Sequence, residues 1–433
     1  MAMDGKELVE KLAKLSQVQS IKDIPHLTHA LFPGTHCPLM GAAMAVGGIK
    51  DSLIVVVGTD ECTYYTKSMT IHSEKFGGID GRCVSVVLDD HDVTFGSAEK
   101  VQEAFKEIIE EYRPQCVFLV TTCVIEIIGD DFDAISEGLS ELYGIPVLPV
   151  HTEHFKCEDH LPGLERTITV CAEMMKSCDS DNSVNLLGQR MGDFATTELY
   201  AMLQKAGVKI GLQLPCGCSV DDIKNAAAAK VNIVVNDIAL PLAQKMQEKF
   251  GIPYVYFNKF VIPEKIYEAY KNLFGYLELE LPEELEGLYQ NAREEIEKNK
   301  GELEGITYIY GNTPYAVFEM NCFLSSLGMV PQVIQTNRYT EADEPYAKEI
   351  LQYTDPYVCK AANIAPLQYV YDVLSPYLYL GHEFGNRLRQ KGIAIVHSDR
   401  ASGMLGFEVT GYLLQQLVKS VREAKEYRKE LGL

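Results

Sequence analysis

Three cysteines, Cys37, Cys62 and Cys123, occupy positions from which their thiols could converge on one metal centre. Cys62 follows the apolar run at residues 53–57 through Gly58-Thr-Asp-Glu, and Cys123 ends a second run, Val117-Phe-Leu-Val-Thr-Thr. Cys37 lies in a turn-rich segment just before the first run. Parallel strands bring their carboxyl-end loops to one edge of a sheet, where ligands bind. The sequence therefore predicts that these thiols meet at one sheet edge.

Soft thiolate ligands select iron–sulfur clusters or zinc. An iron–sulfur cluster normally takes four or more protein ligands, so three cysteines make an incomplete set. A second subunit, identical or related, would supply the remainder across an interface. Spacing alone supports this arrangement weakly, because separated single cysteines are less specific than Cys-x-x-Cys pairs.

Two further groups of side chains could bind metal. In Leu214-Pro-Cys-Gly-Cys-Ser, Cys216 and Cys218 are close enough in sequence to coordinate one metal. A flexible loop with two small thiols, or a reversible redox pair, explains them equally well. His151, His154, Cys157 and His160 follow a predicted strand at spacings of three residues, which match no standard zinc finger. Ordinary hydrogen bonding within the loop is the favoured interpretation of this second group.

A third group could transfer protons. His382 and Glu383 follow a predicted strand, as do Asp399 and Arg400, so both pairs are expected to face a crevice between domains. Histidine titrates near neutrality, so His382 and Glu383 could supply protons to a reaction in that crevice. Alternatively, Asp399 and Arg400 form an ion pair that fixes their loop. The nearby Tyr369, Tyr371, Tyr377 and Tyr379 are expected in the core or at an interface.

The elements that must position these residues are about twelve strand–helix units, each a β-branched run followed by a turn and a helical pattern. The predicted strands are residues 53–57, 84–88, 117–120, 146–150, 184–187, 210–214, 232–235, 254–257, 306–310, 332–335, 377–380 and 393–396, with helices such as 98–112 and 132–143 between them. This alternation is typical of parallel sheets covered by helices.

Two breaks divide the chain into three doubly wound, Rossmann-like α/β domains. Ser, Asp and Asn cluster at residues 177–182, and a Glu-rich helix is expected at 279–305. The predicted domains are residues 1–180, which hold the cluster, 181–300, which include the connecting helix, and 301–433.

Composition excludes several function classes. Acidic residues outnumber basic ones by 61 to 39, a formal charge of −22 that would repel nucleic acid. No apolar run is long enough to cross a membrane, and the N-terminal residues alternate charge with Leu and Val, so we expect a cytoplasmic protein. Thiols stay reduced there, and Cys83, Cys116, Cys171 and Cys322 fall inside elements as packing residues.

The residues around the three cysteines resemble the nitrogenase component 1 superfamily, in particular its β-type chains. The matching segments are Cys37-Pro-Leu-Met-Gly-Ala-Ala-Met-Ala, Cys62-Thr-Tyr-Tyr, Val93-Thr-Phe-Gly, Thr121-Thr-Cys-Val-Ile-Glu-Ile-Ile-Gly-Asp-Asp, Pro149-Val-His-Thr-Glu-His-Phe, His397-Ser-Asp-Arg and Leu405-Gly-Phe-Glu. The resemblance covers almost the whole chain, more loosely in the middle. Gly129-Asp-Asp-Phe-Asp and Ser97 also make sense as helix caps alone.

The resemblance implies that Cys37, Cys62 and Cys123 bind half of an interfacial cluster, either a 4Fe-4S cluster or a larger P-cluster-like one. It implies a partner that is a second copy or an α-type subunit, and an ATP-dependent iron protein as electron donor. Two departures matter. Gly58-Thr-Asp-Glu-Cys62 replaces the family's Gly-Pro-x-Gly-Cys, and the cofactor-binding Cys and His of α-type chains have no counterpart at Asn236 or in Ser402-Gly-Met-Leu-Gly.

We therefore expect a subunit of a nitrogenase-like reductase that relays electrons to a substrate or second metal site. The alternatives are a metallocluster assembly scaffold without turnover, and a zinc or small-molecule binding protein that kept the fold. The sequence does not identify a substrate.

Overall fold

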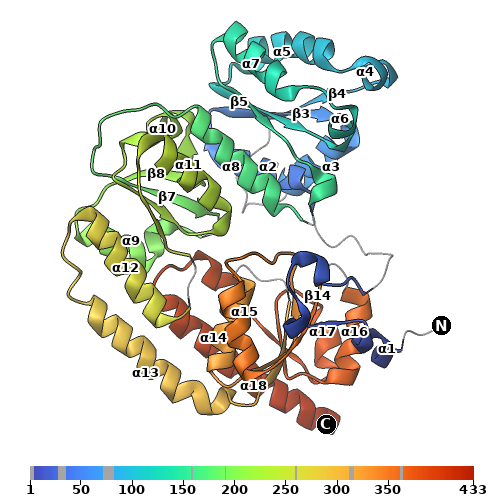
Figure 1. Ribbon diagram of the computed structural model, residues 1–433, viewed down its shortest axis with the longest axis vertical. Helices are drawn as coiled ribbons and strands as arrows, with labels where there is room; N and C mark the ends of the chain where they lie inside the picture. Colours follow the sequence, from blue (N-terminus) through green and yellow to red (C-terminus); the bar gives the residue numbers. More distant parts are fainter. Residues whose placement is uncertain are drawn as a thin grey trace.

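Three main parallel sheets follow one another along the chain in the computed structural model (Figure 1). The structure describes residues 4–27, 36–71, 82–157, 159–190, 192–258, 261–311, 316–360 and 364–433. Helices cover the faces of each sheet, so the predicted class of doubly wound α/β units is confirmed.

The first sheet holds four parallel strands in the order β4-β3-β5-β6 (Cys83–Val87, Ser52–Gly58, Cys116–Thr121 and Val147–Val150). Successive side chains of β3 point to opposite faces. Leu53, Val55 and Val57 pack with helices α5 (Ala98–Tyr112) and α7 (Phe132–Tyr143). Ile54 and Val56 pack on the other face with α2 (Pro38–Gly47) and α8 (Leu161–Val170). Burial on both faces explains the continuous apolar run.

The second sheet has the order β11-β10-β7-β8 (Tyr254–Tyr256, Val231–Val234, Val184–Gln189 and Ile210–Pro215). Its helices are α9 (Glu198–Lys205), α10 (Val220–Lys224), α11 (Leu240–Phe250) and α12 (Pro263–Leu277). One face shares a single apolar core with the first sheet, in which Leu187, Leu212 and Val234 join Ile54 and Phe118. A short parallel pair, β2 (Ile49–Lys50) with β9 (Cys218–Ser219), also links the two units.

The third sheet has six strands, β1-β14-β13-β12-β15-β16 (Ala13–Lys14, Tyr357–Cys359, Val330–Gln335, Thr307–Tyr310, Leu378–Leu380 and Ala394–Val396). The N-terminal strand β1 is antiparallel to β14, and α1 (Gly5–Glu10) packs on α16 (Ile364–Leu374). Residues 4–27 thus pack on the third sheet, although the sequence grouped them with the first. The boundaries near residues 180 and 300 stay predictions.

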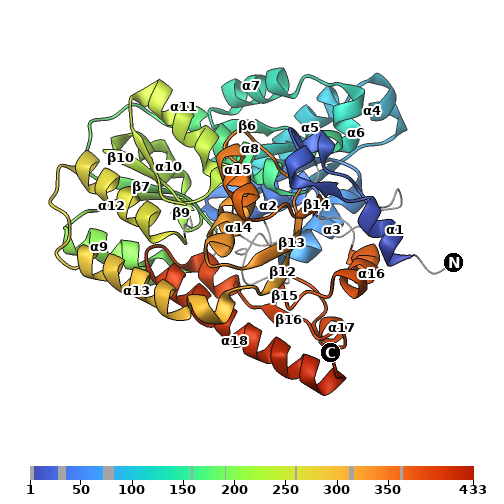
Figure 2. The same cartoon turned by 60° about the horizontal axis from the view of Figure 1, so that its bottom comes forward.

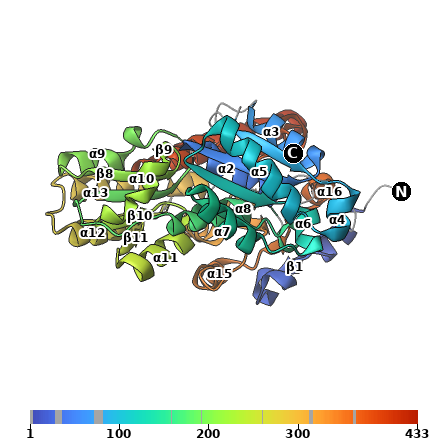
Figure 3. The same ribbon diagram turned by 90° about the horizontal axis from the view of Figure 1, so that it is seen from above.

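The other helices of the third unit are α14, α15, α17 and α18 (Val317–Ser326, Glu344–Tyr353, Gly385–Arg389 and Glu408–Leu431). The long α18 runs beside the connecting helix α13 (Leu285–Leu303), and Figure 2 shows the two side by side below the sheets. At the start of α18, Glu198 of the second unit accepts a hydrogen bond from the Phe407 backbone N–H at 3.1 Å. Seen from above, the second unit lies beside the first (Figure 3).

All twelve predicted strands are present. The connecting helix begins at Leu285 rather than near residue 279, after Pro282, and it buries Leu285, Ala292 and Leu303. The predicted packing cysteines Cys83, Cys116, Cys171 and Cys322 are buried. Among the described helices, none has the length and apolar character needed to cross a membrane.

Candidate metal centre

Each of the three predicted cysteine ligands lies at the N-terminus of a helix. Cys37 is the N-cap residue of α2, Cys62 lies in the first turn of α3 (Asp60–Ile71), and Cys123 is the first residue of α6 (Cys123–Ile128). All three are half-buried free thiols. A helix N-terminus carries partial positive charge, which stabilises a thiolate, the form that binds metal.

The three thiols are close enough to act on one another. Burial raises the pKa of the Cys123 thiol, and the nearby Cys62 and Cys37 thiols raise it further. Mutual repulsion of this kind opposes three thiolates at one site unless a positive group lies between them. The donor set therefore fits a positively charged metal group, which would neutralise the three charges.

A close contact between two loops fixes Cys62 and Cys123 relative to each other. Thr122, next to Cys123, donates its hydroxyl hydrogen to the Val57 carbonyl at 2.9 Å. Gly58, which follows Val57, has no room for a side chain, because a Cβ there would lie 2.0 Å from the Thr122 Oγ1. Glycine at this position lets the end of β3 approach the end of β5, and so brings together the loops that carry the two thiols.

A second close contact fixes Cys37. Helices α2 and α8 cross at two glycines: a Cβ on Gly41 would lie 2.0 Å from the His160 carbonyl oxygen, and one on Gly163 would lie 1.8 Å from the Pro38 carbonyl oxygen. Pro38 directly follows Cys37. The crossing therefore holds the N-terminus of α2, and its cysteine, against the N-terminus of α8.

The loop after β6 contributes a histidine to the thiol site. His154 Nδ1 lies 2.9 Å from Cys123 Sγ. The other members of the predicted group point elsewhere. His151 Nε2 lies 3.2 Å from Asp133 Oδ2, Cys157 Sγ donates to the Thr152 carbonyl at 3.7 Å, and burial lowers the pKa of His160 to about 4. The structure does not bring these four side chains together.

No group of three or more His, Cys, Asp or Glu side chains in the described ranges has the geometry to hold a single metal ion. An iron–sulfur cluster is larger than one ion, and its thiolate ligands bind separate iron atoms. Half-buried thiols that influence one another without converging on a point suit such a cluster better than zinc, which requires four donors around one centre.

Cys216 and Cys218 lie in different surroundings. Cys218 belongs to strand β9 and is 2% exposed, within the core shared by the first two sheets. Cys216 is half-buried, and its Sγ donates to the Arg190 carbonyl at 3.6 Å. Burial raises the pKa of both thiols, that of Cys218 to about 12, so both favour the neutral form. A shared metal at this pair stays a prediction.

The predicted proton donors lie on the third sheet, after β15. His382 Nε2 lies 3.5 Å from Asp399 Oδ1, and both side chains are exposed. Burial raises the pKa of Glu383, which lies near the buried Tyr371 and Tyr379. Arg400 stacks over Tyr412 rather than pairing with Asp399. Tyr371 and Tyr379 are core residues as expected, whereas Tyr369 is 40% exposed.

The two expected helix caps differ. Asp131 caps α7 by accepting from the Ala134 backbone N–H at 3.0 Å. Ser97 precedes α5, but its hydroxyl donates to Asp130 at 2.6 Å instead of capping the helix. Asp130 thereby joins the loop after α6 to the segment after α4 (Asp90–Phe95).

The corresponding edge of the second sheet has no soft donor after β10. Asn236 accepts a hydrogen bond from the Ile238 backbone N–H at 3.2 Å and so caps the next turn. The adjacent Asp237 accepts from Asn258 at 2.9 Å and from the Tyr256 hydroxyl. After β7 comes Arg190, whose surroundings cannot be predicted from the sequence, because an arginine in a loop leaves no local pattern.

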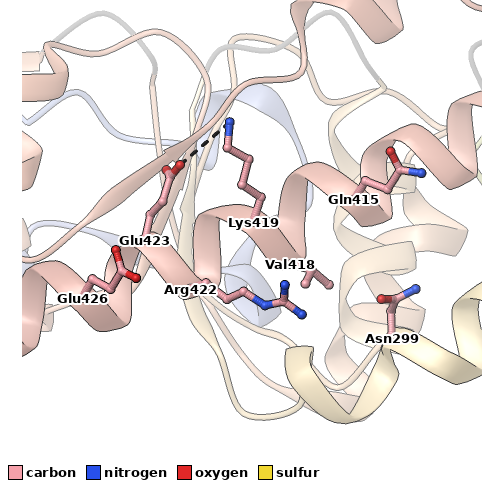
Figure 4. A pocket seen from close by; sticks show the side chains of 7 residues that line it. All are labelled: Asn299, Gln415, Val418, Lys419, Arg422, Glu423 and Glu426. Carbon is pink, nitrogen blue, oxygen red and sulfur yellow. Dashed lines mark ion pairs between the residues drawn. The ribbon is translucent and has the colours of Figure 1, made fainter.

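Figure 4 shows a pocket between α13 and α18, lined by charged and polar side chains such as Lys419 and Glu423. Arg422 from this wall binds Glu302 of α13 at 2.8 Å. The pocket contains no thiol and lies on helices of the third unit and its connection. It is a surface feature separate from the candidate centre.

The three sheets, with thiols gathered at the carboxyl edge of the first, define a class of three-unit α/β proteins. The sequence matches the family of nitrogenase component 1 type oxidoreductases over residues 37–422, and the chain belongs to this family. The fold supports the assignment: a solved structure titled "Nitrogenase Cp1 at pH 6.5" superposes with a TM-score of 0.78 at 15% identity, covering 92% of this chain and 94% of that one.

Two curated relatives carry the same printed name, nitrogenase iron-molybdenum cofactor biosynthesis protein NifE. The protein from Clostridium pasteurianum is 31% identical over 224 residues, which cover 51% of this chain and 49% of the relative. The protein from Rippkaea orientalis is 25% identical over 331 residues, which cover 73% and 69%. The matched part of this chain thus spans about half the length of the first relative.

Proposed function

We propose that this chain is the cluster-holding subunit of a metallocluster assembly scaffold in the nitrogenase component 1 family. The observation that carries the proposal is the position of three half-buried thiols at three helix N-termini, two of them near enough to Cys123 to raise its pKa. The printed name that the two relatives above share is that of a biosynthesis protein, which favours assembly over turnover. Asn236, used as a cap, favours it too, because the second sheet offers no thiol at that strand end.

Cys37, Cys62 and Cys123 would hold the iron–sulfur cluster. When bound, such a cluster supplies a centre that accepts and releases single electrons. The chain's own part is to orient the thiols through the Gly58–Thr122 contact and the α2–α8 crossing. His154, next to the Cys123 sulfur, would stabilise the thiolate by hydrogen bonding.

A partner subunit would complete the site. Large apolar side chains are exposed on helices that follow strands β3 to β6, at the same sheet edge as the thiols. They are Tyr64 and Tyr65 on α3, Phe95 on α4, Ile127 on α6 and Phe155 beside His154, each more than 60% exposed. Exposed apolar groups gathered on one edge are typical of protein interfaces. Both a second copy and an α-type subunit fit this surface.

The experiment that tests the proposal follows iron out of the protein. The chain, purified anaerobically with its partner, is loaded with ⁵⁷Fe and sulfide and mixed with an apo-acceptor component 1 protein. Assembly predicts that labelled iron moves to the acceptor as intact cluster, detected by Mössbauer spectroscopy after separation. Retention of all label on this chain through many reduction cycles contradicts the scaffold role.

A second candidate is the catalytic component of a reductase fed by an ATP-dependent iron protein. The exposed His382–Asp399 pair and the partly buried Glu383 favour it, since they place titratable groups at a sheet edge where substrates bind. His382→Ala and Glu383→Gln separate the candidates. A reductase loses turnover in these variants, whereas cluster transfer by a scaffold is unchanged.

A further inference from the structure

Arg190 lies where ligands bind in open parallel sheets. It directly follows β7, which is flanked by β10 and β8 in the second sheet, so its loop is at the carboxyl edge. A loop of the third unit approaches the same place, because a Cβ on Gly192 would lie 2.8 Å from the Cα of Gly403. The first unit approaches too, since Arg190 acts electrostatically on His160 at the start of α8.

The guanidinium of Arg190 has no partner among the residues that the structure describes. No hydrogen bond or ion pair joins it to any of them. Two other arginines of the chain are paired with carboxylates: Arg338 lies 3.7 Å from Glu165, and Arg166 lies 2.7 Å from Glu153. Burial lowers the pKa of Arg190, so the group is largely withdrawn from water while part of its surface stays accessible. Such a charge is costly without a counter-ion.

The surroundings of Arg190 are suited to a single negative charge. His160 is neutral at pH 7, because burial and the Arg190 charge lower its pKa to about 4. A neutral imidazole can donate or accept a hydrogen bond without adding charge. Asp159 acts on Arg190 only at longer range, and its carboxylate accepts from the Leu161 backbone N–H at 2.9 Å. The Cys216 thiol is the other electrostatic neighbour.

We propose that Arg190 binds the carboxylate of a small anionic ligand at the carboxyl edge of the second sheet, with the His160 imidazole as a second hydrogen-bonding group. The planar guanidinium matches a carboxylate with two parallel hydrogen bonds. Partial burial strengthens this attraction, because the local dielectric is low. A phosphate dianion would keep a net negative charge beside this single arginine, whereas a carboxylate would be neutralised. The proposal does not depend on whether the protein is a scaffold or a reductase.

Titration of the full chain with carboxylates and inorganic anions tests this proposal. Malonate, lactate and citrate are compared with phosphate and sulfate at equal ionic strength, by isothermal titration calorimetry and by thermal unfolding. We expect at least one carboxylate to bind more tightly than either inorganic anion and to raise Tm. Arg190→Gln should weaken that binding at least about tenfold, as expected for a lost charged hydrogen bond.

Two further variants keep the test decisive. Arg190→Lys retains the charge but not the planar fork, and its affinity should fall between those of the wild type and Arg190→Gln. Arg338→Gln is the matched control, since this arginine also follows a strand but already has a carboxylate partner, and its binding should equal that of the wild type. Without added anion, Arg190→Gln should unfold at the same temperature as the wild type or a higher one. Equal affinity in Arg190→Gln, tighter binding of phosphate than of every carboxylate, or no binding at all overturns the proposal.

Discussion

The carboxyl edges of the first and second sheets have the same architecture but opposite chemistry. At the first, three half-buried thiols occupy helix N-termini, and burial together with the nearby Cys62 and Cys37 thiols raises the pKa of Cys123. At the second, Asn236 caps a turn, and Asp237 accepts hydrogen bonds from Tyr256 and Asn258. The guanidinium of Arg190 has no hydrogen-bond or ion-pair partner among the residues that the structure describes. The strand–helix frame fixes where ligands bind, and the side chains after each strand decide which ligand binds.

The largest expected effect comes from removing a thiol at the first edge. Cys37→Ala, Cys62→Ala or Cys123→Ala should each lower the iron retained by anaerobically purified protein at least about tenfold, because each thiolate holds part of the cluster. Iron and acid-labile sulfide analysis measures this loss. Cys178→Ala is the control, since Cys178 is exposed and donates only to the Asn225 carbonyl. Equal iron loss in Cys178→Ala would mean that removal of any thiol lowers the iron content, and that Cys37, Cys62 and Cys123 do not form a specific site.

The contact between β3 and β5 should matter next. Gly58→Ala places a Cβ 2.0 Å from the Thr122 Oγ1, so the loops that carry Cys62 and Cys123 must move apart. Backbone strain and overpacking together should lower the free energy of unfolding by about 3–5 kcal/mol. Urea denaturation of the apo-protein measures this loss. Gly138→Ala is the matched control, because a Cβ there meets nothing within 4 Å.

His160 links the two edges and predicts a dependence on pH. Its pKa is about 4 in the folded chain, against 6.5 for an ordinary histidine. The unfolded chain therefore takes up a proton first as the pH falls. The free energy of unfolding should decrease from pH 6.5 towards pH 4, by at most about 3 kcal/mol from this group. At neutral pH His160 is largely uncharged in both the folded and the unfolded chain, so this loss of unfolding free energy is absent.

His160→Gln isolates this contribution from that of the acidic side chains. The variant should lose less stability than the wild type between pH 6.5 and 4.5 in urea denaturation. Identical losses in the two proteins would show that His160 is not kept neutral by its surroundings.

The smallest expected effect concerns the ion pair between the first and third units. Arg338 and Glu165 are separated by 3.7 Å and are partly exposed, so Arg338→Gln should change the free energy of unfolding by only about 0–1 kcal/mol. Thermal unfolding at low and high salt measures it. A loss several times larger would mean that this pair, rather than the apolar cores, holds the units together.

Much of this arrangement could be predicted from the sequence, because it depends on local patterns. Buried strands such as β3 have apolar side chains on both faces, and their ends place Cys62 and Cys123 at one edge. Short strands at the sheet margin could not be predicted from the sequence. Strand β14 has three residues, and β1 pairs with it across more than 340 positions. Contacts at such separation leave no local pattern.

Side-chain partners were the least predictable part of the site. The spacing of His151, His154, Cys157 and His160 suggests one group, yet His154 contacts Cys123, while His160 is buried at the start of α8, where the charge of Arg190 helps to lower its pKa. Those partners depend on how α6 and α8 are placed by tertiary packing. The tight approach of Thr122 to Gly58 is likewise visible only once β3 and β5 are adjacent.

The central claim is that the three thiols form half of a site shared between subunits. Native mass spectrometry of the anaerobically purified protein, with iron and sulfide quantified in each species, tests it most directly. Our account predicts iron and sulfide in a species of two component 1 type chains and almost none in the monomer. A monomer that retains the full complement of iron, or a well-folded protein that carries zinc and no iron, would contradict it.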